Sequence, residues 1–262
     1  MEEVVVTRPE ERTVILTLNR PNSLNSINPA MVGVLTDTLD DIARDDTVSV
    51  VVLTGAGRGF CSGADLRAAE GLREVGQTSG AFNPVSFLRE VSSPMKALIG
   101  VPQVTIAAVN GPAIGAGLGL ALGCDIRFAQ SGATFGATAI SMGLSPDFAL
   151  SKTLQNALGY SRALELVLTG RMMGAQEALS SGLVSIVSEH VVEDALRLAE
   201  RMCRAPAHSL RIVKRLLQVA DADSLDIVLR DSEPFALDAI VRRADFLEDA
   251  SRWTASYNRT DS

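Results

Sequence analysis

The sequence predicts an α/β protein, because strand-like runs alternate with glycine-rich loops and helix starts over most of its 262 residues. Val48 to Leu53 is a β-branched run, which is typical of a parallel strand covered on both faces. It leads into an almost uncharged glycine-rich loop at Gly59 to Leu66. The run Val101 to Val109 repeats this design before a second loop at Asn110 to Leu120. A chain of this length buries roughly 70–75% of its unfolded surface, so the core is ample.

The N-terminal part predicts a strand followed by a helix. Thr13 to Asn19 alternates apolar and polar residues, as a half-buried strand does. Asn28 and Pro29 suit the cap and the first residue of an amphipathic helix that reaches about Arg44. Four apolar residues of this helix share one face: Met31, Leu35, Leu39 and Ile42.

The middle of the chain contains an uncharged stretch, Ala97 to Cys124, that is long enough to span a membrane. Pro102 and five glycines from Gly111 to Gly123 would leave backbone groups unsatisfied in lipid. We therefore predict a buried strand, a turn and a buried helix there. Helical periodicity returns between Ala149 and Thr169. Three further short strands are predicted at Ile126 to Ala129, Thr134 to Phe135 and Leu183 to Val187.

The C-terminal part predicts helices with almost no sheet. From Val191 onward the periodicity is helical, with breaks at Ala205-Pro206 and around Asp221 to Ser224. We therefore expect two domains, a core over residues 1–205 and a helical C-terminal region over residues 206–262.

The composition excludes two classes of partner. Lys and Arg total 24 against 31 Asp and Glu, a net charge of −7 without a basic cluster, so we expect no nucleic acid and no membrane. The three cysteines show no paired spacing and no apolar leader precedes the first strand, which favours the cytoplasm. No zinc pattern is present, and no metal or redox cofactor is expected.

The two glycine-rich loops are the main functional signal. Small residues at Gly63, Ala64, Gly115, Ala116 and Gly117 let a ligand approach the main chain. Two such loops can direct two backbone N–H groups at one oxygen, as an oxyanion hole requires. This arrangement suits a carbonyl group that becomes an enolate. The alternative is that both loops are ordinary tight turns.

Two other interpretations of these loops fit the residues less well. The glycine spacing does not complete a dinucleotide-binding motif, and the acidic residue that such a site needs is missing. Cys61 and Ser62 lie in the first loop without a nearby histidine, so we expect them to pack rather than to act as nucleophiles. Glu90 is expected on a solvated face.

Four ordered motifs carry a resemblance to a known family: RPNSLNSI, GFCSGADL, AVNGPAIGAGLGLALGCDI and EALSSGLV. In this order and at these separations they resemble the enoyl-CoA hydratase/isomerase (crotonase) superfamily, over nearly the whole chain. The resemblance implies a crotonase-like core, a spiral of ββα turns, with a C-terminal helical trimerisation region, and a homotrimer or a dimer of trimers. It also implies an acyl-CoA thioester whose carbonyl lies between the N–H groups of Ala64 and Ala116.

The sequence departs from the hydratases of this family at their two glutamate positions, which here are Gly119 and Ala139. Neither residue titrates, whereas hydration needs one group for water and another for the proton. Asp147 follows a G-L-x-P turn, where some isomerases of the family carry their acid/base aspartate. One carboxylate is enough to shift a double bond. Its expected apolar neighbours, which would raise its pKa, are Met142, Leu144, Phe148 and Leu150.

Three readings of function therefore stay open. The leading one is isomerisation of an enoyl-CoA double bond with Asp147 as acid and base. The second is a hydratase or related lyase with an atypical acid/base group, and the third is a non-catalytic acyl-CoA-binding homologue. Asp147 is also suited to cap a helix that begins near Phe148.

The resemblance also assigns residues to coenzyme A, which enters as part of the substrate rather than as a cofactor. An aromatic residue near the C-terminus matches the family, whereas the family's lysine place is Ser256. The residues implied in binding are Arg20, Leu24, Asn25, Ala64, Asp65, Leu66, Arg67, Gly115 and Trp253.

Overall fold

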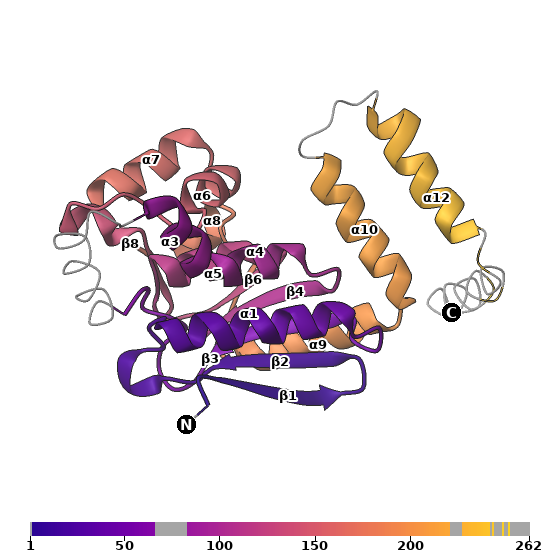
Figure 1. The fold of residues 1–262 in the computed structure, drawn as a ribbon, viewed down its shortest axis with the longest axis horizontal. Helices are drawn as coiled ribbons and strands as arrows, with labels where there is room; N and C mark the ends of the chain where they lie inside the picture. Colours follow the sequence, from indigo (N-terminus) through magenta and orange to yellow (C-terminus); the bar gives the residue numbers. More distant parts are fainter. Residues whose placement is uncertain are drawn as a thin grey trace. The chain divides into compact units, whose positions relative to one another are not determined.

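The computed structural model describes residues 2–65, 83–220 and 227–241, together with Arg243, Glu248 and Ser251 (Figure 1). The chain divides into two units, Met1–Arg201 and Met202–Ser262. The roles expected for the two domains, acyl-CoA binding and trimerisation, remain predictions.

The first unit contains a six-stranded sheet with the strand order β1-β2-β3-β4-β6-β9. β1 runs antiparallel to β2, and every other pair of neighbours is parallel. Parallel neighbours require crossover connections, which the helices of this unit supply. The strands are β1 (Val4–Glu10), β2 (Thr13–Leu18), β3 (Val50–Gly55), β4 (Val104–Val109), β6 (Ile126–Gln130) and β9 (Ile186–Ser188).

Helices cover this sheet, and α1 and α4 pack against each other (Figure 1). α9 begins in the first unit and ends just beyond its boundary. The helices are α1 (Pro29–Arg44), α3 (Pro84–Val91), α4 (Ser93–Gly100), α5 (Ala116–Gly123), α6 (Leu150–Leu158), α7 (Tyr160–Thr169), α8 (Ala175–Ser180) and α9 (Val191–Cys203). This unit also contains two short 3-10 helices, η1 (Pro21–Ser23) and η2 (Thr138–Met142).

The predicted N-terminal helix is confirmed at both ends. The Asn28 side chain accepts a hydrogen bond of 2.8 Å from the Met31 N–H, and Pro29 is the first helical residue. This pairing satisfies one of the free donors at the helix start. The predicted apolar face is buried, with the side chains of Met31, Leu35, Leu39 and Ile42 at most 5% exposed.

The two β-branched runs form the predicted parallel strands. Every residue of β3 and of β4 is buried, which explains why both runs are apolar without alternation. Each strand ends where a glycine-rich loop begins. The sheet therefore delivers both loops to the same edge, since the carboxyl ends of neighbouring parallel strands lie side by side.

Periodicity did not reveal every element. The edge strand β1 was not predicted, and neither were β5 (Ala113–Ile114) and β8 (Met172–Gly174), which form a three-stranded sheet with β7 (Thr134–Gly136). Strands of two or three residues are too short to show an alternation. The helical stretch predicted between Ala149 and Thr169 is two helices, separated at Gly159, whose φ of 76° ends α6.

The second unit is helical in its described part. α10 (Ala207–Ala220) and α12 (Glu233–Val241) lie side by side (Figure 1), with a π-helical turn, η3 (Val228–Ser232), before α12. The predicted break at Ala205-Pro206 is confirmed, whereas the break at Asp221 to Ser224 lies outside the described residues. Within the described chain, no helix has both the length and the apolar character to cross a membrane.

Candidate functional site

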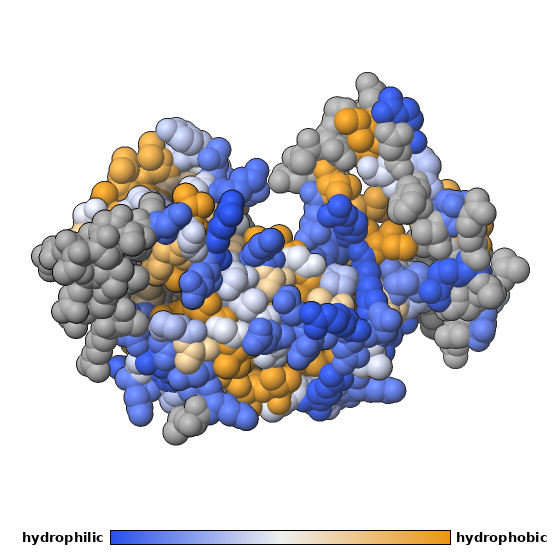
Figure 2. Space-filling model, viewed as in Figure 1, coloured by the Kyte–Doolittle hydropathy of each residue, from blue (hydrophilic) through white to orange (hydrophobic). Residues whose placement is uncertain are grey.

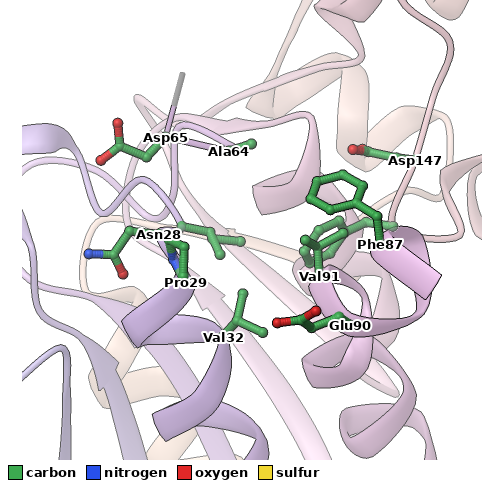
Figure 3. Close-up of a pocket in the computed structure, with 11 residues that line it drawn as sticks. Asn28, Pro29, Val32, Ala64, Asp65, Phe87, Glu90, Val91 and Asp147 are labelled. Carbon is green, nitrogen blue, oxygen red and sulfur yellow. The ribbon is translucent and has the colours of Figure 1, made fainter. Parts of the chain in front are cut away.

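A cavity of about 310 Å³ opens between the start of α1, the first glycine-rich loop, α3 and the segment before α6 (Figure 3). Its volume is at the small end of the range for ligand pockets, about 300–1,000 Å³. The cavity is therefore large enough for a small ligand or for one part of a larger one. Its apolar lining comes from Ile27, Pro29, Val32, Phe87, Val91 and Phe148, and its polar lining from Asn28, Asp65, Glu90 and Asp147.

The first loop holds Ala64 against the cavity with its N–H unused. The Ile27 N–H donates to the Gly63 carbonyl, and the Asp65 N–H donates to the Ile27 carbonyl, both at 2.8 Å. In such a parallel bridge the hydrogen bonds are made by the backbone groups of the residues on either side of Ala64. The N–H of Ala64 itself therefore points away from Ile27. Within the described chain this N–H donates no hydrogen bond.

The second loop leaves another N–H free at the start of α5. Gly115 has φ 53° and ψ −119°, a conformation that glycine alone adopts readily. Its carbonyl accepts the first helical bond from the Gly119 N–H at 2.9 Å. The N–H of Ala116 therefore points out of the helix N-terminus, where the helix dipole adds partial positive charge, and it has no acceptor among the described residues.

Direct hydrogen bonds hold the two loops together. The Cys61 N–H donates to the Pro112 carbonyl at 3.0 Å, and the Ile114 N–H donates to the Cys61 carbonyl at 2.9 Å. Gly63 has φ 100°, and a Cβ placed on it would lie 2.9 Å from the Ile114 carbonyl oxygen and 3.8 Å from the Ala116 nitrogen. Close contact between the loops thus requires glycine at Gly63 and also at Gly117, and the two unused N–H groups lie on neighbouring segments.

Asp147 is the most buried unpaired carboxylate of the cavity. Burial raises the pKa of its carboxyl, and a hydrogen bond from its own backbone N–H offsets part of this increase. Of the apolar residues expected around it, Phe148 lines the cavity, and Phe148 and Leu150 are both at most 3% exposed. Met142 and Leu144 are about half exposed and are not among the described residues that line the cavity. Phe87 and Val91 of α3 line the same cavity instead (Figure 3).

The interpretation of Asp147 as a helix cap is wrong. α6 begins at Leu150, its cap residue is Ala149, and no side chain caps it. Phe148 and Ala149 both have left-handed backbones, with φ 47° and 56°. Such conformations cost free energy in residues other than glycine and tend to occur at functional sites. This turn directs the Asp147 carboxylate at the cavity rather than at the helix.

Phe148 also occupies the space next to Gly119, one of the two positions where hydratases of this family carry glutamate. A Cβ on Gly119 would lie 2.8 Å from the Phe148 Cβ and 2.9 Å from its carbonyl oxygen. No side chain fits there unless the Phe148 backbone moves. The second position, Ala139, lies in η2 and likewise offers no titratable group.

Arg20 and Asp65, both implied in CoA binding, form an ion pair with each other. The Arg20 Nη2 lies 2.8 Å from the Asp65 Oδ2, and the Arg20 Nε lies 3.2 Å from the Glu3 Oε2. Arg20 also donates to the carbonyl of Ser26. These contacts fasten the turn after β2 to the first loop, next to Ala64. A direct role of either side chain toward CoA remains a prediction.

Leu24 and Asn25 form the left-handed part of this turn, with φ 51° and 57°. The Asn25 side chain is fully buried. Its amide donates to the carbonyls of Ala56 and Gly59 at 3.0 and 2.8 Å, and its Oδ1 accepts from the Arg20 N–H at 2.8 Å. Asn25 therefore joins two loops, and its contacts are internal.

We expect Asn25→Ala to lower the free energy of unfolding by about 2–4 kcal/mol, because three buried or partly buried backbone groups lose their hydrogen-bond partner and alanine is strained at this φ. Urea unfolding measures the change. Asn22→Ala, at an exposed position of the same turn, is the matched control and should change stability little. A stable Asn25→Ala variant with a raised KM for its thioester would instead indicate direct contact with CoA.

Other sequence predictions have simpler outcomes. Leu66, Arg67 and Trp253 lie outside the described residues. Cys61 is buried, and burial raises the pKa of its thiol to about 12, so it stays protonated and packs as expected.

The helix α3, which forms one wall of the cavity, was not predicted from the sequence. Asn83 caps this helix by accepting from the N–H groups of Val85 and Ser86 at 3.0 and 3.1 Å. The pair Asn83-Pro84 repeats the Asn-Pro signal that located α1, and it would have located α3 as well. Glu90 is exposed, as predicted, but it also lines the cavity.

A sequence model of the enoyl-CoA hydratase/isomerase family matches residues 9–234, and the chain belongs to this family. A protein of Mycobacterium leprae (strain TN), named "Probable enoyl-CoA hydratase echA12", is 39% identical over 258 residues, which cover 96% of this chain and 87% of the relative. The "1,2-epoxyphenylacetyl-CoA isomerase" of Escherichia coli (strain K12) is 35% identical over 261 residues, 97% of either chain.

The crystal structure of a monofunctional enoyl CoA isomerase from M. smegmatis superposes with a TM-score of 0.72 and 37% identity, over 88% of this chain and 99% of that one. The predicted crotonase-like α/β fold is therefore confirmed. The relatives include proteins named as hydratases and as isomerases, so membership of the family alone leaves the reaction open.

Proposed function

We propose that this enzyme moves the double bond of an enoyl-CoA, with Asp147 as the single acid and base. The observation that carries the proposal is the turn at Asp147 and Phe148. It directs one carboxylate at an apolar cavity and places the Cβ and the carbonyl oxygen of Phe148 against Gly119, where they leave no room for a side chain. The two unused N–H groups of Ala64 and Ala116 serve as donors to the thioester oxygen.

In this mechanism the ionised Asp147 takes a proton from C2 of a 3-enoyl thioester. The electron pair of the broken C–H bond moves toward the thioester carbonyl and gives a dienolate. The N–H groups of Ala64 and Ala116 stabilise its negative oxygen, aided by the N-terminus of α5. Asp147 then returns the same proton at C4, which leaves the double bond between C2 and C3. Protons and electrons balance without a further reactant.

Hydration is the second candidate, supported by the name of the M. leprae relative. It requires a group that positions and deprotonates water in addition to a proton donor. The usual glutamate positions are Gly119 and Ala139, and Phe148 fills the space beside the first. The third reading, a non-catalytic binding protein, is set aside if thioesters turn over.

We expect the wild type to convert a 3-enoyl-CoA to the 2-enoyl-CoA roughly 100-fold faster or more than it hydrates that product, since general acid/base groups typically contribute about 10²–10⁴-fold. Chromatographic identification of the products of both substrates measures the ratio. Gly119→Glu should gain no hydratase activity, because Phe148 occupies the space of the new side chain. Rapid hydration of a 2-enoyl-CoA by the wild type would contradict the proposed reaction.

A homotrimer or a dimer of trimers, located in the cytoplasm, is part of the same proposal. Large apolar side chains are exposed on α7 and on the helices of the second unit (Figure 2). Exposed apolar groups of this size are typical of surfaces that pack against another chain. Those with the largest exposed fractions are Tyr160, Leu168, Val213, Leu217, Leu229 and Leu237.

A further inference from the structure

The far end of the cavity carries a charge that the proposed reaction does not use. In Figure 3, Ala64 and Asp147 lie at one end of the cavity, and Val32 and Glu90 lie at the other. A thioester carbonyl held at Ala64 places its C2 to C4 atoms beside Asp147. The acyl chain beyond C4 then runs between α1 and α3 toward Val32 and Glu90.

Glu90 belongs to the face of α3 that lines the cavity. Phe87, Glu90 and Val91 are spaced three and four residues apart, so their side chains share one side of the helix. Both apolar neighbours face the cavity as well (Figure 3). Within the described chain the Glu90 carboxylate makes no hydrogen bond and no ion pair.

The charged groups that the described residues contribute to the cavity lining are all negative. Among the described lining residues the ionisable ones are Asp65, Glu90 and Asp147, and none is basic. Asp65 is paired with Arg20 at 2.8 Å, and Asp147 performs the proton transfer in the proposed function. Among the described residues Glu90 is thus a carboxylate without a counter-ion, at the end of the cavity where the acyl chain terminates.

We propose that Glu90 is a specificity-determining residue that restricts the enzyme to acyl groups with an uncharged end and rejects chains that end in a carboxylate. The inference rests on the proposed function for the direction of the acyl chain. A terminal carboxylate would approach a like charge and find no cation among the described lining residues. A terminal methyl group or ring contacts Val32, Phe87 and Val91 without this repulsion.

Binding of two unreactive thioesters tests the proposal. Hexanoyl-CoA and adipoyl-CoA have saturated acyl groups of equal length that differ only in a terminal methyl or carboxylate group. We expect calorimetry to show that the wild type binds adipoyl-CoA about 10-fold more weakly or worse, since like charges near a protein surface repel on this scale. Glu90→Gln should lower the dissociation constant of adipoyl-CoA about 5-fold and change that of hexanoyl-CoA by less than about 2-fold.

The control is Glu10→Gln, which removes the same charge from β1, at an exposed position outside the cavity. It should leave the ratio of the two dissociation constants unchanged. Glu90→Lys should favour adipoyl-CoA further. The inference is overturned if the wild type binds both thioesters equally, if Glu90→Gln shifts both alike, or if neither thioester binds. Because both ligands are unreactive, a missing isomerase activity refutes the proposed reaction while the binding ratio still decides the role of Glu90.

Discussion

Asp147→Asn is expected to lower isomerase turnover by roughly 10²–10⁴-fold, the typical contribution of general acid/base catalysis. The amide has the shape of the carboxylate but takes no proton from C2, so the fold and the binding of a thioester persist. Steady-state assay with a 3-enoyl-CoA measures the loss, and calorimetry with hexanoyl-CoA confirms that binding is retained. An undiminished rate in this variant would remove Asp147 from the mechanism.

The pH dependence of this variant separates a catalytic role from a structural one. The ionised form of Asp147 is the base, so the wild-type kcat/KM should rise with pH through the raised pKa of this carboxyl, and the Asn variant should lack this rise. The pH dependence of the stability has the opposite sign. The unfolded chain releases the Asp147 proton near pH 3.9, before the folded protein does, so stability falls between the two pKa values as pH rises. Asp147→Asn should therefore be at least as stable as the wild type at neutral pH.

Ala116→Pro is expected to reduce turnover by roughly 100-fold or more, the usual loss when one oxyanion donor is removed. Ala116 is the first residue of α5, where proline is tolerated because its N–H would have no helical partner. The substitution therefore deletes the proposed donor and leaves the helix intact. A 3-enoyl-CoA assay, together with circular dichroism, measures both effects.

Ala116→Gly is the matched control, because it keeps the N–H and changes only the side chain. It should retain most of the activity, apart from the cost of a more flexible helix start. If a folded Ala116→Pro variant kept full activity, Ala116 would not be a donor to the thioester oxygen.

The sequence predicted the elements whose residues carry a strong local signal. The cap and the buried face of α1 follow from Asn28-Pro29 and the apolar spacing, and the buried strands β3 and β4 follow from uninterrupted β-branched runs. The glycine-rich loops indicated close backbone contact, and Gly63 and Gly117 have it: a Cβ on Gly117 would lie 2.1 Å from the Cys61 carbonyl oxygen.

The remaining features depend on contacts between distant parts of the chain. The cavity end near Val32, Phe87 and Glu90 lies between α1 and α3. No local sequence pattern indicates how far apart these two helices lie in space. The absence of a glutamate at Gly119 was visible in the sequence, but the contact of the Phe148 Cβ and carbonyl oxygen with this position was not. Likewise, Arg20 was expected to face CoA, but its side chain binds Asp65. These two residues are 45 positions apart, so no local pattern reveals their ion pair.

The contact between Phe148 and Gly119 constrains how this enzyme could change its reaction in evolution. A Cβ at position 119 would meet the Cβ and the carbonyl oxygen of Phe148, and every residue except glycine keeps this Cβ at position 148. A smaller side chain at position 148 therefore makes no room for a glutamate at position 119. A mutational path from this site to a two-carboxylate site must instead move the backbone of the turn at Phe148 and Ala149, or place the second carboxylate elsewhere.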